Sequence, residues 1–138
     1  MSGCAGVGKS FLASAFGHQA CRQGHAVAYY NVQKLMTQLK VSRLDGLLLK
    51  SMERLAKVDL LILDDFGLTP LDSNQQNDFM ELIEDRHARK STIIASQLPV
   101  SAWFDVFPEA TVADAILDRI VHTSHRIDLK GDSLRKKR

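Results

Sequence analysis

Close to its start the chain carries the stretch Gly3-Cys4-Ala5-Gly6-Val7-Gly8-Lys9-Ser10. The stretch matches the phosphate-loop pattern G-x-x-x-x-G-K-[ST], in which glycines let backbone N–H groups approach phosphate oxygens. A helix that begins near Gly8 would add its positive end to the same site. Lys9 would bind the β- and γ-phosphates, and the Ser10 hydroxyl would bind Mg²⁺. The motif predicts a nucleotide site; the competing interpretation is a glycine-rich helix start without a ligand.

A second motif lies in the middle of the chain, where an apolar run over 60–63 ends in Asp64 and Asp65. Parallel α/β sheets form their ligand crevice at the carboxyl ends of the strands. Asp64 would therefore hold Mg²⁺ through water, and Asp65 would orient and deprotonate the attacking water. Most enzymes of this type have Glu at the second position, so the shorter Asp65 predicts slow turnover. The alternative is an aspartate pair that caps a helix.

A polar residue, Gln97, follows the next apolar run, at 92–96. If that run is a strand beside 58–63, its tip lies at the same edge of the sheet as the two aspartates. Gln97 could then reach the γ-phosphate or the attacking water, or it could cap the following turn. Trp103, a few residues later, is expected to be a packing anchor rather than a surface for base stacking.

Hydrophobic periodicity divides the rest of the chain into alternating strands and helices. The expected strands cover residues 26–31, 58–63, 92–96 and 126–129. The expected helices cover residues 8–22, 32–40, 43–56, 75–89 and 111–122, and a helical turn is expected at 100–104. Strands separated by helices of this length predict a parallel α/β sheet. The runs at 58–63 and 92–96 are apolar enough to be buried on both faces.

The periodicity also predicts which helix faces pack inward. In the first helix the apolar residues at helical spacing are Phe11, Leu12, Ala15 and Phe16. In the helix over 75–89 the inner face is set by Phe79, Leu82, Ile83 and Arg86. Asp72 or Ser73 can cap that helix at its start.

Composition fits one globular domain. The chain has 138 residues, of which 45% are hydrophobic and 25% charged, and no apolar run approaches the roughly 20 residues of a membrane span. Neither a signal peptide nor metal-ligand cysteine spacing is evident, so we expect a cytoplasmic protein. The charge is segregated: residues 1–58 and 119–138 are basic and residues 59–118 are acidic. This pattern indicates either a surface for a polyanion or helix faces that merely differ in charge.

Taken together, the motifs resemble the IstB family, the AAA+ ATPase helpers of insertion-sequence transposases, which are related to the DnaC helicase loaders. The stretches that carry the resemblance are the phosphate loop and residues 61–67, 95–100, 113–122 and 129–137. The resemblance implies a three-layer, parallel-sheet P-loop NTPase fold, the AAA+ core, over 1–138, with a basic tail at 130–138. It also implies ATP as the nucleotide, with Mg²⁺.

The resemblance further implies ATP-dependent self-assembly on DNA, largely independent of DNA sequence, and delivery of a transposase. Arg119 resembles the arginine finger that reaches a neighbouring subunit's ATP site, and Arg135 resembles the second sensor arginine. A salt bridge from Arg119 to Asp114 or Asp118 is the alternative for the first. A plain phosphate or solvent contact is the alternative for Arg135.

The chain departs from the family pattern at its start, because only Met1 and Ser2 precede Gly3. In the family a central strand precedes the phosphate loop, and a DNA- and partner-binding segment lies further upstream. We therefore expect an N-terminally truncated AAA+ core that lacks its first, central strand. Three functions remain open: an ATPase that helps transposition, a DnaC-like helicase loader, and a non-catalytic remnant that only interacts with full-length subunits.

Overall fold

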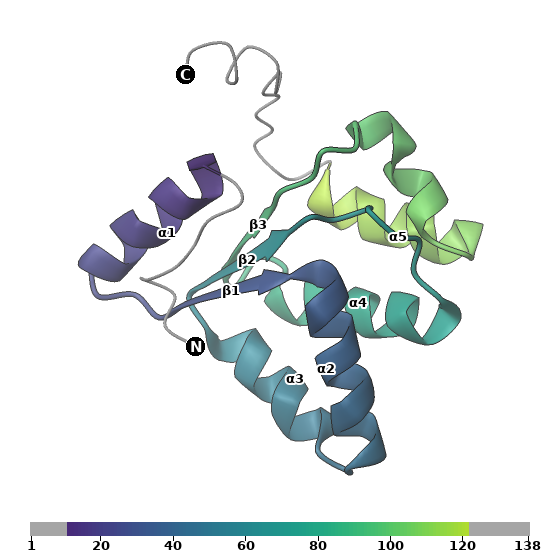
Figure 1. Ribbon diagram of the computed structural model, residues 1–138, viewed down its shortest axis with the longest axis horizontal. Helices are drawn as coiled ribbons and strands as arrows, with labels where there is room; N and C mark the ends of the chain where they lie inside the picture. Colours follow the sequence, from purple (N-terminus) through teal and green to yellow (C-terminus); the bar gives the residue numbers. More distant parts are fainter. Residues whose placement is uncertain (1–10, 122–138) are drawn as a thin grey trace.

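The computed structural model describes residues 11–121, with side chains from residue 15, and its centre is a three-stranded parallel sheet. The strands β1 (Val27–Asn31), β2 (Leu60–Asp64) and β3 (Ser91–Ile94) lie in the order β1-β2-β3 (Figure 1). The predicted parallel α/β sheet is confirmed. The strand expected at 126–129 lies outside the described residues.

Helices connect and flank the strands, with bounds that differ from the prediction mainly at one turn. They are α1 (Phe11–Arg22), α2 (Val32–Leu44), α3 (Leu48–Lys57), α4 (Ser73–Arg86) and α5 (Ala110–Ile120), with a 3₁₀ helix at Val100–Val106. The expected boundary at residues 40–43 was wrong, because α2 continues to Leu44. The turn follows at Gly46, whose φ of +75° favours glycine.

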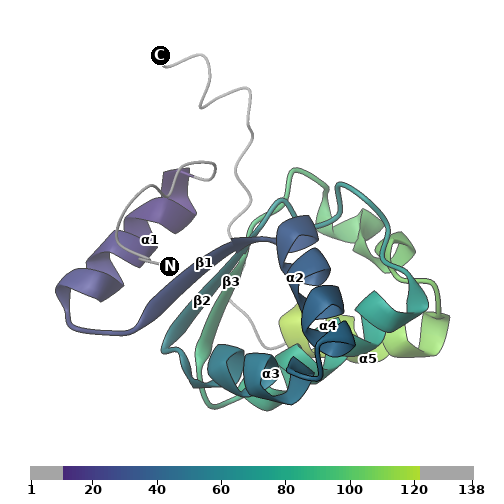
Figure 2. The same ribbon diagram turned by 60° about the horizontal axis from the view of Figure 1, so that its bottom comes forward.

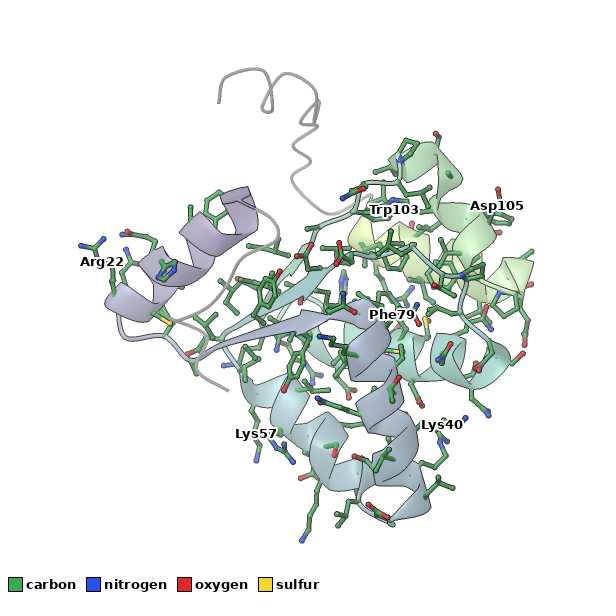
Figure 3. All side chains as sticks on the ribbon, in the orientation of Figure 1. Arg22, Lys40, Lys57, Phe79, Trp103 and Asp105 are labelled. Atoms are coloured by element: carbon green, nitrogen blue, oxygen red, sulfur yellow. The ribbon has the colours of Figure 1, made fainter. Side chains whose placement is uncertain are left out.

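Helix α1 lies on one face of the sheet, and α2 to α5 lie on the other (Figures 1 and 2). On the first face α1 covers a small cluster around Leu60 and Ile62. On the opposite face α2 to α5 enclose the main core, which includes Leu61 and Leu63 from β2. Phe79 and Trp103 point into this core in Figure 3. The three-layer arrangement implied by the resemblance is therefore present in the described part of the chain.

Over residues 15–22, where its side chains are described, helix α1 approaches the sheet through a glycine. Ala15 and Phe16, which were expected on the inner face, are exposed, whereas Gly17 is buried. A Cβ added to Gly17 would lie 2.9 Å from Cδ1 of Ile62. The helix approaches β2 so closely that the side without a side chain faces the sheet, which hydrophobic periodicity does not reveal.

Strand β3 is less buried than predicted. The five residues of β2 are all buried, but β3 begins with an exposed Ser91 and continues with partly buried residues. The reason is position: β2 lies between two strands, whereas among the described residues β3 pairs only with β2. The expected second fully buried strand is therefore corrected to a half-covered one, which ends at Ile94 instead of residue 96.

A capping box starts α4. The Asp72 carboxylate accepts from the Gln75 backbone N–H at 2.8 Å, and the Gln75 side chain accepts from the Asp72 N–H at 3.0 Å. These reciprocal bonds satisfy two backbone donors at a helix start. Of the two predicted caps, Asp72 is thus the one used.

Arg86 lies on the inner face of α4, as predicted, and is 1% exposed. Its guanidinium donates to the carbonyl oxygens of Leu55 at 2.7 Å and Val58 at 2.8 Å, and to the Thr92 hydroxyl at 2.9 Å. It also donates to the Ser91 carbonyl. Burial lowers the pKa of Arg86 to about 10, so the group remains charged at neutral pH. One side chain therefore joins the end of α3 to the starts of β2 and β3.

Candidate functional site

The carboxyl end of β2 presents two buried carboxylates. Asp64 and Asp65 are 4% and 7% exposed. Leu60, Ile62 and Asp64 occupy every second position of the strand, so their side chains lie on the same face of the sheet. This is the face that α1 covers. The described part of α1 starts at Phe11, which follows Ser10, the last residue of the phosphate-loop motif, in the sequence. The strand therefore places Asp64 on the same face as the helix that follows the motif.

Both oxygens of Asp64 accept hydrogen bonds. Oδ1 accepts from the backbone N–H of Asp65 at 2.8 Å. Oδ2 accepts from the Tyr29 hydroxyl, which comes from the neighbouring strand β1. The carboxylate is thus fixed from two directions before any ligand is considered.

Asp65 has an unusual backbone conformation, with φ at +58°. Its Oδ2 accepts from Nδ2 of Asn31 at 2.9 Å, and Asn31 is the residue paired with Asp64 in the β1–β2 register. The Oδ1 atom of Asn31 accepts from the Lys34 N–H at 3.1 Å and so caps α2. Sequence reasoning missed Tyr29 and Asn31. The rule that selected Gln97, a polar residue where a parallel strand ends, also applies to Asn31.

An aromatic cluster anchors the chain directly after Asp65. Phe66 is 1% exposed, and its ring lies 5.5 Å from that of Phe79 and 4.9 Å from that of Trp103, between ring centroids. Trp103 is 7% exposed and donates from Nε1 to the Leu98 carbonyl at 2.9 Å. The predicted packing role of Trp103 is confirmed, and the cluster limits how far Asp65 can move.

Gln97 lies in the segment after β3 and is exposed. This segment is joined to the end of β2, because Ala95 donates to the Leu63 carbonyl at 2.8 Å and accepts from the Phe66 N–H at 3.0 Å. The turn is closed by Ser96, whose hydroxyl accepts from the Leu98 N–H at 3.0 Å. Gln97 therefore lies two residues after Ala95, whose backbone is bonded to the residues on either side of Asp64 and Asp65.

Arg119 occupies the last turn of α5, near the helix end as expected. Its guanidinium forms an ion pair with Glu84 of α4 and donates from Nη1 to the Ala115 carbonyl at 3.0 Å. The expected alternative partners, Asp114 and Asp118, are therefore replaced by a residue of another helix. The side chain is 30% exposed.

The residues at the end of β2 suit a metal ion that is bound jointly by the protein and a nucleotide. They suit a metal ion held by protein side chains alone less well. The described part of the chain contains no group of three or more His, Cys, Asp or Glu side chains that could hold a metal ion. Asp64 offers hard carboxylate oxygens, which suit Mg²⁺, and Mg²⁺ is commonly bound by one or two carboxylates plus phosphate oxygens. Residues 3–10 and Arg135, the other predicted ligands, lie outside the described residues.

Comparison with protein families matches the whole chain, residues 1–138, to a family described as IstB-like ATP binding protein. An insertion-sequence ATP-binding protein of Sinorhizobium fredii is 53% identical over 134 residues, which are 97% of this chain and 55% of that protein. The IS21 ATP-binding protein of Pseudomonas aeruginosa is 33% identical, over 96% of this chain and 50% of its own length. The chain therefore spans about half the length of these relatives.

Solved structures show the same fold. The crystal structure of DnaI matches with a TM-score of 0.74 at 22% identity, covering 88% of this chain and 66% of that one. DnaA of Aquifex aeolicus, solved with AMPPCP bound, matches with a TM-score of 0.70 at 22% identity, covering 84% of this chain and 36% of that one.

No helix within residues 11–121 is long and apolar enough to cross a membrane.

Proposed function

The chain belongs to the family of IstB-like ATP-binding proteins, and we propose that it binds and hydrolyses ATP as a helper of transposition. The observation that carries the proposal is the placement of Asp64. A buried carboxylate ends β2 on the face covered by α1, and the phosphate-loop motif immediately precedes α1. This is the combination that a Mg²⁺–ATP site requires.

In the proposed site the backbone of Gly3, Cys4, Ala5, Gly6, Val7 and Gly8, together with Lys9, binds the phosphates. Ser10, and Asp64 through water, would hold Mg²⁺, which would neutralise charge on the phosphate oxygens. Asp65 orients the attacking water and accepts its proton, and Gln97 contacts that water or the γ-phosphate. Arg119 completes the site of a neighbouring copy, and Arg135 contacts the nucleotide from the C-terminal segment. The products are ADP and phosphate.

We test nucleotide binding by titrating the chain with a fluorescent ATP analogue in the presence of Mg²⁺. Lys9→Ala removes a charged contact to phosphate, and such contacts contribute about 1.5–3 kcal/mol, or roughly 10- to 100-fold in affinity. Lys40→Ala is the control, since Lys40 is an exposed lysine of α2 that points away from the sheet (Figure 3). Equal affinity in the two variants would refute the assignment of the phosphate loop.

We also propose that the assembled protein binds DNA largely without sequence preference and recruits or activates a transposase. Lys130 and residues 135–138 supply positive charge. Each phosphate contact adds roughly 0.9 to the slope of log K against log salt on duplex DNA. Deletion of residues 135–138 is expected to lower both the DNA affinity and this slope in a salt titration. An unchanged slope would show that the DNA contacts lie elsewhere.

The family favours this function over helicase loading. The relatives are named as proteins of insertion sequences, whereas the resemblance to DnaI is a resemblance of fold. A self-associating ATPase is also consistent with a site in which Arg119 acts on a neighbour. In that arrangement the oligomer, and not the single chain, is the active species.

A further inference from the structure

We propose that Tyr29 is a positioning residue whose hydroxyl orients the Asp64 carboxylate for Mg²⁺ and so sets how strongly the metal enhances ATP binding. The inference rests on the proposed function, because it concerns the carboxylate that would hold Mg²⁺ in that site. Tyr29 matches no position of the phosphate-loop pattern, and its role follows from its contact with Asp64.

The geometry gives Tyr29 a direct hold on the carboxylate. β1 and β2 run parallel with Tyr29 paired to Ile62 and Asn31 paired to Asp64. Tyr29 therefore lies one step behind Asp64 on the same face of the sheet, and its hydroxyl reaches forward to Oδ2. Because Oδ1 already accepts from the Asp65 N–H at 2.8 Å, the tyrosine completes the fixation of the group.

The ring of Tyr29 is itself held in place. It is partly buried against the cluster of Leu60 and Ile62, on which Ala20, Val27 and Ile93 also pack. A donor on a packed ring keeps its direction, whereas a donor on a flexible side chain or a water would not. Asp64 is 4% exposed, so little water is available to replace the hydroxyl if it is removed.

Groups that hydrogen-bond a metal ligand from behind orient it, and their removal commonly costs about 10- to 100-fold in metal affinity or activity. For Tyr29 this cost would appear in one quantity, the ratio of ATP affinities with and without Mg²⁺. ATP binding in the absence of metal depends on the phosphate loop and would remain unchanged. A purely structural role would instead weaken both affinities together or lower stability alone.

The experiment compares Tyr29→Phe with Tyr30→Phe. Both variants lose one hydroxyl from adjacent positions of β1, but Tyr30 lies on the opposite face, against the main core. Affinity for a fluorescent ATP analogue is measured in Mg²⁺ and in EDTA, and thermal melting is recorded for each variant. We expect the Mg²⁺ enhancement to fall about 10-fold or more in Tyr29→Phe. It should keep the parent value in Tyr30→Phe, and the EDTA affinities should agree.

A double variant makes the test specific to the contact. If the hydroxyl acts through the Asp64 carboxylate, adding Tyr29→Phe to Asp64→Asn should change the Mg²⁺ enhancement no further. Two results would overturn this inference and leave the proposed function standing. In the first, Tyr29→Phe keeps the full Mg²⁺ enhancement of the parent. In the second, Tyr29→Phe weakens ATP binding equally in Mg²⁺ and in EDTA. A parent chain that binds ATP in neither buffer would overturn the proposed function, and the inference would fall with it.

Discussion

Replacing Arg86 with methionine is expected to lower the free energy of unfolding by about 3–5 kcal/mol, because several buried acceptors lose their donor at about 1–3 kcal/mol each. Methionine fills much of the volume but donates no hydrogen bond. The carbonyls of Leu55, Val58 and Ser91 would then lose a buried charged donor. Urea denaturation of the variant and the parent measures the difference.

Two variants complete the comparison at Arg86. Arg89→Met changes an exposed arginine just beyond the same helix and should stay within about 0.5 kcal/mol of the parent. Arg86→Lys keeps the charge but cannot reach several acceptors at once, so its loss should lie between the other two. If Arg86→Met unfolds at the same urea concentration as Arg89→Met, the network contributes nothing and the interpretation is wrong.

The second large effect is expected in ATP turnover. Loss of an arginine finger costs roughly 10³–10⁵ in rate, so Arg119→Ala should be almost inactive, and so should Asp65→Asn. If Arg119 acts on a neighbour, mixing the two inactive variants should restore part of the activity, because some interfaces then contain both intact groups. Steady-state phosphate release measures the recovery. A mixture no more active than its components would place Arg119 in its own subunit's structure.

Glu84 provides the control for a structural role of Arg119. Glu84→Gln breaks the same ion pair, which is partly exposed and contributes at most about 1 kcal/mol. If the arginine serves mainly to hold α5 on α4, Glu84→Gln and Arg119→Ala should lower turnover equally. If it serves a neighbour's site, Glu84→Gln should retain parental turnover, since the guanidinium must leave Glu84 to reach a phosphate.

The sheet and the position of Asp64 could be predicted because both depend on local patterns. A buried strand needs a short apolar run, and the two carboxylates directly follow it. The turn at Gly46 was harder to place, since the residues on both sides favour helix and only the left-handed conformation of the glycine separates α2 from α3. Likewise, the close approach at Gly17 could not be predicted, because the apolar pattern pointed to Ala15 and Phe16, which are exposed.

The contacts of the site depend on register and on helix packing, which one sequence does not display. Tyr29 and Asn31 reach the aspartates only because β1 pairs with β2 as it does. The expected partners of Arg119 were poor choices even locally. Asp118 is its immediate neighbour and Asp114 precedes it by five positions, and residues at these separations do not face each other on a helix. Glu84 could be found only once α4 and α5 were placed side by side.

The two ends of the sheet carry different side-chain bonds, and this decides which contacts can yield to a ligand. At the amino ends, Arg86 joins three segments through backbone carbonyls, and Asp59 accepts from the Ala26 N–H at 2.9 Å. At the carboxyl ends, bonds from Tyr29 to Asp64 and from Asn31 to Asp65 are added by side chains to a backbone ladder that continues to the end of β2. A ligand that draws these carboxylates forward breaks contacts between side chains and leaves the backbone fastening intact. The two carboxylates could then shift toward a ligand while the strands behind them keep their places.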